Sequence, residues 1–284
     1  MTGRTPSLVA PVSHRAVQAG RRIAYIAFRG LRELPTYFIV GAKRAGTTSL
    51  NEYVVDHPDA LRGLVEKGSR FFDVNYERGP AWFNRTLIPR WQIDRLEQRT
   101  GVRPIYGESS PYYCFHPDSP SRIAQHVPNA RLIFLLREPA LRAWSHYRYE
   151  VARGFETLPF VEAVEAEAGR LGQRDATSRE FSLRHHSYVA RGQYASQLAR
   201  LRQHFDPEQV LVIQSETLFG QPKDTMSRVF AHLGLRQYEG AAYKPFKENT
   251  RAGIPDEAAR ILDGRFDDSN AQLRETVGTT ITWL

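Results

Sequence analysis

The 284-residue chain contains one cysteine and no long hydrophobic run. A single cysteine excludes an internal disulfide framework and leaves no second thiolate for a zinc site. We therefore expect Cys114 to be a small buried residue, and we expect a protein of the cytoplasm. The longest apolar run, Leu132 to Leu136, has the length of a strand and is far shorter than a membrane span of about 18 or more residues.

Two widespread site motifs are also missing. The sequence has no G-x-G-x-x-G, which excludes the dinucleotide-binding fingerprint. It has no H-E-x-x-H either, and His185 and His186 are adjacent instead of four residues apart. No metal site is therefore predicted. His146 follows Ser145, but neighbouring helical positions point about 100° apart, so a packing or surface role is predicted for it.

The chain is basic, with a net charge of +8 and a pI near 9.7, and this balance favours anionic ligands. The cations are spread along the sequence and form no lysine-rich tail, so nucleic acid is not an expected partner. Residues 1–35 form a basic extension that is predicted to be helical. It is expected to pack on the domain, with peripheral contact to an acidic membrane as the alternative. The sequence leaves the oligomeric state open.

Beyond residue 35, short β-rich runs alternate with helical stretches. Continuous apolar runs predict strands that are buried on both faces of a parallel sheet. The predicted strands cover 36–40, 104–109, 131–136 and 209–214, and the predicted helices cover 47–56, 117–127, 139–152, 158–169, 191–204 and 221–233. This order predicts one three-layer α/β domain over 36–284, with a P-loop-like central parallel sheet flanked by helices. Ligands of such folds lie at the carboxyl ends of the strands.

The stretch VGAKRAGTTSL, residues 40–50, follows a predicted strand and opens a predicted helix. Gly41 and Gly46 allow a tight turn that brings backbone N–H groups against an anion, and the start of the helix adds partial positive charge. The glycine spacing fits the nucleoside-triphosphate loop G-x-x-x-x-G-K-[ST], but Thr47 occupies the lysine position. The loop therefore predicts a phosphate-bearing ligand and disfavours a kinase or an ATPase.

A second basic motif follows the strand predicted at 131–136. Arg137 lies at the end of that strand, Pro139 begins a helix, and Ser145 lies about two turns into it. A guanidinium at the edge of a sheet is suited to forked binding of a terminal phosphate. Because parallel strands end at the same edge, the two loops are predicted to face one ligand.

Together the two motifs resemble those of sulfotransferases that use 3′-phosphoadenosine 5′-phosphosulfate (PAPS) and release PAP. GAKRAGTTSL is similar to the 5′-phosphosulfate loop, and residues 137–147 match R-[DE]-P-x-x-R-x-x-S-x-Y. The resemblance implies that Arg137 and Ser145 bind the 3′-phosphate, and that Arg44 stabilises charge on the bridging oxygen as the sulfuryl group leaves. The residues it assigns to the phosphosulfate loop are Lys43, Arg44, Ala45, Gly46, Thr47, Thr48 and Ser49.

Further segments refine the branch of this family. Residues 70–87, 106–113 and 191–218 resemble segments of the heparan-sulfate-type carbohydrate sulfotransferases, and residues 266–284 are similar to the end of the family's sequences. The resemblance therefore spans residues 37–284. It implies transfer of a sulfuryl group from PAPS to an acceptor that is a carbohydrate, a glycolipid or a natural product. The expected acceptor group is a hydroxyl, and an amine is the second choice. The alternatives are a P-loop kinase-like phosphotransferase and a non-catalytic nucleotide-binding protein.

Sulfuryl transfer to a hydroxyl needs a base beside the acceptor. The carbohydrate branch commonly carries a glutamate three residues before the first phenylalanine of its F-F-D segment, where this sequence has Gly68. By this resemblance Glu66 is the predicted base, reaching the site through an altered loop, and Glu108 is the reserve candidate.

Three later residues are also assigned by resemblance. Tyr194 matches a family tyrosine near the substrate, with packing in its helix as the alternative. Lys247 and Arg251 lie in a basic segment that closes over the nucleotide in many sulfotransferases, with a plain exposed loop as the alternative.

Overall fold

One parallel sheet forms the centre of the protein. The computed structural model describes residues 31–66, 68–239, 243, 253–278 and 281–284. In this part of the chain the strand order is β2-β3-β1-β4-β5, and all pairings are parallel. The strands are β1 (Tyr37–Gly41), β2 (Ala60–Leu61), β3 (Ile105–Ser109), β4 (Arg131–Leu136) and β5 (Val210–Gln214). The four predicted strands are confirmed to within one residue at each end, whereas the short β2 was not predicted.

All six predicted helices are present, namely α2 (Thr47–Val55), α5 (Ser119–His126), α6 (Pro139–Ala152), α7 (Phe160–Leu171), α9 (Tyr194–Arg202) and α11 (Pro222–Leu233). The bounds of α6 are as predicted, and the other five differ by one to three residues at one or both ends. Among the described residues, six further α-helices were not predicted, namely α3 (Pro80–Thr86), α4 (Arg90–Thr100), α8 (Ala176–His185), α10 (Ser215–Gly220), α12 (Asp256–Leu262) and α13 (Asp267–Val277). Most of these are short or strongly polar, so their apolar faces leave a weak periodic signal.

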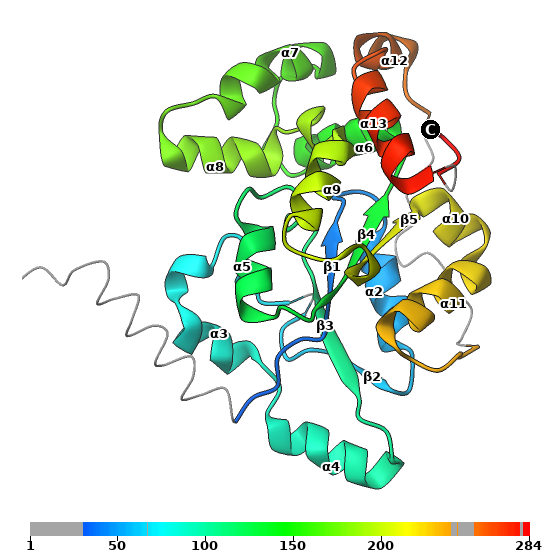
Figure 1. Cartoon of the computed structure of the whole chain (residues 1–284). Coiled ribbons are helices and arrows are strands. Elements are labelled where there is room, and N and C mark those ends of the chain that lie inside the picture. The colour runs from blue at the N-terminus through cyan, green and yellow to red at the C-terminus, as the bar shows by residue number, and fades with distance from the viewer. Residues whose placement is uncertain (1–30, 67, 240–242, 244–252, 279–280) are drawn as a thin grey trace, which may run out of the picture.

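The helices and the sheet form three layers (Figure 1). Helices α2 and α11 contact each other on one side of the sheet, and α5 and α9 lie on the other. Right-handed crossovers between parallel strands require this division, because the chain runs from β1 towards β3 and then back across the sheet to β4 and β5. Helices α6, α7, α8 and α12 lie beyond the end of the sheet towards which the strand arrows point. The predicted fold class is confirmed.

The core follows from strands that are buried on both faces. Phe38, Ile39 and Val40 of β1 are fully buried, as are all the apolar residues of β4. Cys114 is buried beside β1, as predicted. Continuous apolar strands of this kind are stable only inside a sheet that helices cover on both sides.

A second apolar cluster fixes the helix that carries Ser145. Ala143 of α6 is fully buried against Phe160 of α7 and Phe266, which precedes α13. The Phe160 ring meets Trp144 edge-on, with ring centroids 5.1 Å apart. This packing holds α6 rigidly at the carboxyl end of the sheet.

The strand order places a ligand-binding edge between β1 and β4. From β1 the chain continues to β3 on one side, and β4 lies on the other, so the direction of the connections reverses between these two neighbouring strands. Such a switch point leaves a crevice between the two loops that follow the strands, and ligands of open α/β sheets bind there. The two predicted motifs are the segments that follow these strands, one after β1 and one after β4.

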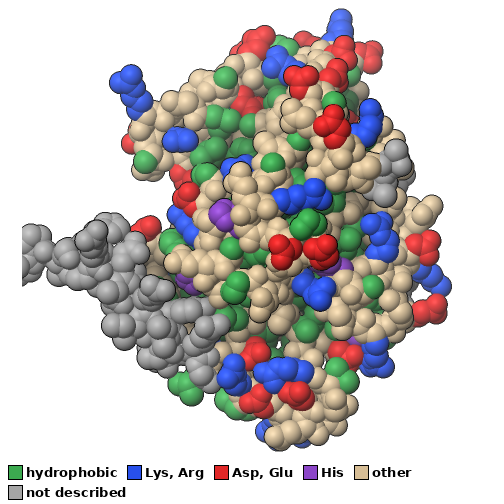
Figure 2. All heavy atoms as spheres, in the orientation of Figure 1, with side chains coloured by type: hydrophobic (Ala, Val, Ile, Leu, Met, Phe, Trp, Pro, Cys, Tyr) green, Lys and Arg blue, Asp and Glu red, His purple; other side chains and the backbone are tan. Residues whose placement is uncertain are grey.

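The molecular surface carries both signs of charge. On the face shown in Figure 2, Lys and Arg side chains are interspersed with Asp and Glu. One such group lies around α4, where Arg103 pairs with Glu33 at 3.0 Å and with Glu97 at 2.6 Å. Within the described residues, every helix is too short or too polar to cross a membrane.

Candidate active site

The segment Ala42–Gly46, here called the phosphate loop, joins β1 to α2 and is held by contacts from two other elements. The Ala42 N–H donates to the Leu135 carbonyl oxygen of β4 at 2.6 Å, and the Ser215 hydroxyl of α10 donates to the Ala45 carbonyl oxygen at 2.6 Å. Gly46 has a φ of +100°, and a Cβ there would lie 2.8 Å from the Phe219 ring. This position therefore requires glycine.

Gly46 is also the N-cap of α2, and no side chain caps the first turn of this helix. The initial N–H groups of a helix lack partners within the helix and carry partial positive charge. Thr47 and Ser49 are buried in this turn, while Thr48 is half-buried. The loop and the turn together have the build of an anion site.

The two sequence motifs meet at this loop. The Arg44 Nε donates to the Ser145 hydroxyl of α6 at 3.1 Å. Arg137, at the end of β4, donates from Nη1 to the Arg44 carbonyl oxygen at 3.2 Å. The prediction that the two loops lie at one edge of the sheet is thereby confirmed, although more than 90 residues separate them in sequence.

Several cations crowd around the phosphate loop. Arg142 and Arg191 are buried close by, and burial together with the charge of Arg142 lowers the pKa of Arg191 to about 10. Burial also lowers the pKa of Arg44 and of Arg137, and the charge of Arg137 adds to the effect on Arg44. A polyanion at the loop would be stabilised by these buried cations, because a nearby negative charge favours the charged form of each.

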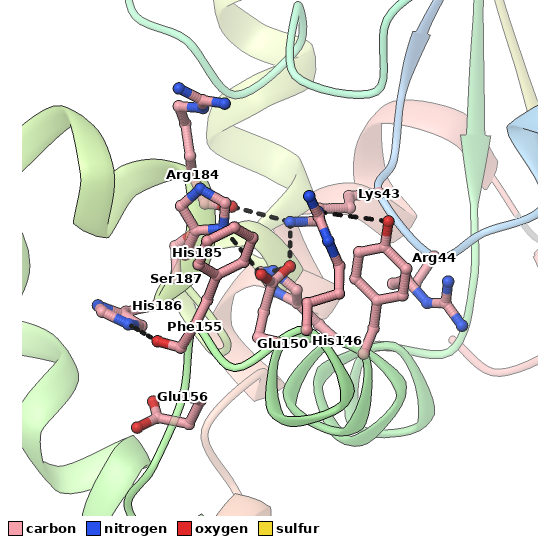
Figure 3. A network of polar contacts seen from close by, with 12 residues as sticks. Lys43, Arg44, His146, Glu150, Phe155, Glu156, Arg184, His185, His186 and Ser187 are labelled. Atoms are coloured by element: carbon pink, nitrogen blue, oxygen red, sulfur yellow. Dashed lines mark hydrogen bonds and ion pairs between the residues drawn. The ribbon is translucent and has the colours of Figure 1, made fainter.

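Lys43 belongs to a buried polar network on α6 and α8 (Figure 3). Its Nζ donates to Glu150 Oε1 at 2.6 Å and to the Arg184 carbonyl oxygen at 2.8 Å. The other oxygen of Glu150 lies 2.8 Å from His185 Nδ1. Burial is the main cause that lowers the pKa of Lys43 to about 7, against the opposing effect of Glu150. His146 is fully buried in the same network, which confirms its predicted packing role.

Tyr194 of α9 supports the backbone of Arg137. Its side chain is fully buried, and its hydroxyl donates to the Arg137 carbonyl oxygen at 2.8 Å. Tyr194 therefore acts on the site by fixing the backbone at the end of β4, consistent with the packing alternative. Lys247 and Arg251 lie outside the described residues.

The two candidate bases occupy different environments. Glu66 is exposed in a turn after β2. Glu108 is buried at the carboxyl end of β3, where Oε1 accepts from the Ser69 N–H at 2.9 Å and from the Ser69 hydroxyl at 2.7 Å. The Tyr113 hydroxyl donates to Oε2 at 2.9 Å. Burial raises the pKa of Glu108, although these hydrogen bonds oppose the shift.

Gly68 explains why no glutamate stands at its position. Its φ is +104°, and a Cβ there would lie 2.7 Å from the Cβ of Glu108. A side chain at residue 68 would therefore collide with Glu108 in a backbone conformation that already disfavours it. The carboxylate beside this turn comes instead from β3.

Sequence reasoning missed Glu150 and Arg191. Arg142, His146 and Glu150 are spaced by four residues, so they share one face of α6, and this spacing was the available signal for Glu150. No local sequence pattern indicated a role for Arg191, because the rings that it contacts, Tyr112 and Phe115, belong to a distant segment of the sequence. In the described part of the chain, no group of three or more His, Cys, Asp or Glu side chains is arranged to hold a metal ion.

Known proteins resemble this chain in sequence and in structure. Human heparan sulfate glucosamine 3-O-sulfotransferase 6 is 32% identical over 226 residues, covering 80% of this chain and 59% of the relative. Human heparan sulfate glucosamine 3-O-sulfotransferase 3A1 is 28% identical over 233 residues, covering 82% of this chain and 52% of the relative. The chain thus spans between half and three fifths of the length of these relatives.

A solved bacterial structure agrees with these relatives. The sulfotransferase from Alicyclobacillus acidocaldarius has a TM-score of 0.68 and 28% identity, covering 88% of this chain and 99% of its own. The motif resemblance to the heparan-sulfate-type branch is therefore confirmed. The profile of the sulfotransferase domain matches residues 34–252, and the chain belongs to this sulfotransferase family.

Proposed function

We propose that this protein transfers a sulfuryl group from PAPS to a hydroxyl group of a carbohydrate acceptor and releases PAP. The observation that carries the proposal is the hydrogen bond from Arg44 Nε to the Ser145 hydroxyl at 3.1 Å. It joins the phosphate loop to the motif after β4, as one ligand with phosphate groups at both ends would require. A nucleotide with 5′-phosphosulfate and 3′-phosphate groups has this form.

Charge around the loop supports a polyanionic donor. The side chains of Arg44 and Arg137 lie at the switch point of the sheet. The buried Arg142 contacts the same loop, with its Nη1 at the Lys43 carbonyl oxygen. Arg137 and Ser145 would hold the 3′-phosphate through charge-assisted hydrogen bonds. The loop N–H groups and the start of α2 would hold the 5′-phosphosulfate.

In the transfer step the acceptor oxygen forms a bond to sulfur while the bond from sulfur to the bridging oxygen breaks. Arg44 would stabilise the negative charge that develops on that bridging oxygen, which then remains on the 5′-phosphate of PAP. The proton of the acceptor hydroxyl passes to a carboxylate on the opposite side of the sulfur. Correct positioning of the two reactants supplies much of the remaining rate enhancement.

We propose Glu108 as that carboxylate, in preference to Glu66. Glu108 ends a strand at the ligand-binding edge, and its raised pKa suits a base better than that of an ordinary exposed glutamate. Its side chain fills the space beside Gly68, where the carbohydrate branch commonly carries a glutamate. Glu66 is exposed on the turn that precedes Gly68.

The acceptor is proposed from the relatives. Two of them are named as 3-O-sulfotransferases of heparan sulfate glucosamine, and this supports a carbohydrate acceptor that contains glucosamine. Transfer to an amine is the second candidate, supported by the human bifunctional heparan sulfate N-deacetylase/N-sulfotransferase 3, which is 29% identical over 208 residues.

Calorimetry with PAP and with ATP, followed by transfer from labelled PAPS, tests the proposal. We expect PAP to bind at nanomolar to micromolar concentration without a comparable affinity for ATP, and label to appear in heparan-type oligosaccharides. Preference for ATP would favour the kinase-like alternative. Tight PAP binding without transfer to any hydroxyl or amine acceptor would favour a non-catalytic nucleotide-binding protein.

A further inference from the structure

We propose that Lys43 anchors the phosphate loop and is not a ligand of the donor, and that Glu150 is a positioning residue which holds Arg44 in place through this anchor. The proposal rests on the proposed function, because that function gives Arg44 its role. It distinguishes Lys43 from Arg44, two adjacent cations of one loop that would otherwise be equal candidates for contacting the donor.

The ammonium of Lys43 is engaged away from Arg44. Of its three donor positions, one is used by Glu150 at 2.6 Å and one by the Arg184 carbonyl oxygen at 2.8 Å. Its side chain is 16% exposed, so few water molecules compete for these contacts. Figure 3 shows the Lys43 side chain directed at Glu150, while the Arg44 side chain leaves the loop in a different direction.

Glu150 holds its partner firmly because its carboxylate has no contact with solvent. Its side chain is 0% exposed, and the other groups beside it are His185 Nδ1 at 2.8 Å and His146 Nε2 at 3.3 Å. Burial alone would raise the pKa of Glu150, but the hydrogen bond with His185, the nearby His146 and the charge of Lys43 lower it. A buried carboxylate that loses its cation is left uncompensated, which strongly destabilises the fold.

The anchor ties the loop to a helix that also reaches the segment after β3. Arg184 and His185 form the last turn of α8, where free carbonyl groups carry partial negative charge and favour a cation. Earlier in α8, Glu180 accepts a hydrogen bond from the Tyr112 hydroxyl at 3.2 Å. Helix α8 thus connects the phosphate loop with the segment that follows Glu108.

The backbone of Arg44 explains why an anchor is needed next to it. Arg44 has a φ of +73°, a left-handed conformation that costs a residue with a side chain of the order of 1 kcal/mol or more. Such a conformation persists only when its surroundings fix it. Lys43 precedes it directly, so release of the Lys43 side chain would let residue 44 relax and move its guanidinium from Ser145.

A double-mutant cycle on thermal stability tests the anchor without any ligand. We expect Lys43→Met and Glu150→Gln each to lower the thermal midpoint by roughly 5–10 °C, and the double variant to be no worse than either single one. Additive effects of the two substitutions would overturn the proposal.

The same helical region offers a matched control pair. Arg170 and Glu156 also lie 2.6 Å apart, with the cation 19% and the carboxylate 1% exposed, but they do not touch the phosphate loop. Arg170→Met and Glu156→Gln should show similar coupling in stability while the folded protein keeps its turnover.

Kinetics and PAP binding then separate an anchor from a donor ligand. For Lys43→Met we expect a fall in kcat of about 10- to 100-fold, because small misplacements of catalytic groups are costly, with the Kd for PAP within about threefold of wild type. Glu150→Gln should behave alike, and Lys43→Arg should restore part of kcat. A tenfold or greater loss of PAP affinity in Lys43→Met, together with unchanged or tighter binding in Glu150→Gln, would overturn the proposal. Absence of PAP binding in the wild type would instead refute the proposed function, and the stability cycle would still decide whether the anchor exists.

Discussion

The site has two halves that are built differently. The cationic half consists of the phosphate loop and residues 137–145, and each of its parts is held by hydrogen bonds to the other. The acidic half consists of residues 68–73 and the end of β3, where the turn at Gly68 and Ser69 wraps over the buried Glu108. In the first half the residues of the two family motifs lie together, as Arg44, Arg137 and Ser145 show. In the second half glycine stands where the family pattern commonly has a glutamate, and the side chain of Glu108 from β3 fills the space beside it.

Under the proposed function, the cationic half would bind the donor and the acidic half would bind the acceptor. A donor with fixed phosphate groups would require fixed cations, and the two loops at the switch point of the sheet supply them. The acidic half is the one that departs from the family pattern, at Gly68. The following predictions test this contrast, beginning with the largest expected effect.

Replacement of Glu108 tests the acidic half. We expect Glu108→Gln to lower kcat by about 10²- to 10⁴-fold, the usual contribution of a general base, while Glu66→Gln leaves kcat near the wild-type value. Steady-state kinetics at saturating PAPS measure both. Full activity of Glu108→Gln combined with loss in Glu66→Gln would assign the base to the exposed turn.

The pH profile gives a second measure of Glu108. Because burial raises its pKa above the ordinary 4.5, kcat of the wild type should fall with decreasing pH at higher values than for an exposed glutamate, and Glu108→Gln should lack this limb. A raised pKa also means that the stabilisation from the protonated form is lost as pH rises through that pKa. The glutamine variant should therefore keep its thermal midpoint at neutral pH, which separates lost catalysis from lost folding.

Replacement of Arg44 tests the cationic half at the reacting atoms. Arg44→Met should lower kcat by about 10²- to 10³-fold, as expected when one preorganised group that stabilises developing charge is removed. Arg44→Lys should retain a larger part of kcat, because a cation remains. Single-turnover measurements with pre-bound PAPS report this step directly. A variant that lost PAP affinity but kept its single-turnover rate would show that Arg44 only binds the donor.

Arg137 tests donor binding without chemistry. Arg137→Ala should weaken PAP binding by roughly 10- to 100-fold, since charge-assisted hydrogen bonds to a phosphate are lost. Arg131, at the opposite end of β4, is a suited control, because it is exposed and bonds the His232 carbonyl oxygen. Calorimetry of Arg131→Ala should return the wild-type Kd. Equal affinities for all three proteins would show that the 3′-phosphate lies elsewhere.

The smallest effect is expected at Gly68. Gly68→Ala should lower the free energy of unfolding by about 1–3 kcal/mol, because the new methyl group collides with Glu108. Gly101→Ala is the matched control, since Gly101 also has a positive φ, of +72°, but a methyl group at that position would meet nothing within 4 Å. Chemical denaturation measures both values. If both substitutions lower the free energy of unfolding by the same amount, Gly68 is not packed against Glu108 as described.

The sequence predicted the parts of the molecule that local patterns determine. Apolar runs located the strands, and the loops after β1 and β4 were assigned because glycine, arginine and serine stood at informative positions. The path of residues 68–73 was not predictable, since the collision of residue 68 with Glu108 depends on two segments 40 positions apart in sequence. The environment of Lys43 was hidden for the same reason, because Glu150 and Arg184 reach it from distant helices.

The contacts that fix the phosphate loop have a consequence for how the protein folds. Its partners Arg137, Ser145 and Ser215 are 93, 101 and 170 residues away from the positions that they hold. Contacts of such separation form late, because the entropy of closing long loops has to be overcome first. During synthesis the loop emerges early, yet it attains its final geometry only after α10 has docked. Under the proposed function, nucleotide binding should therefore report complete folding, and a chain truncated before residue 215 should lose it.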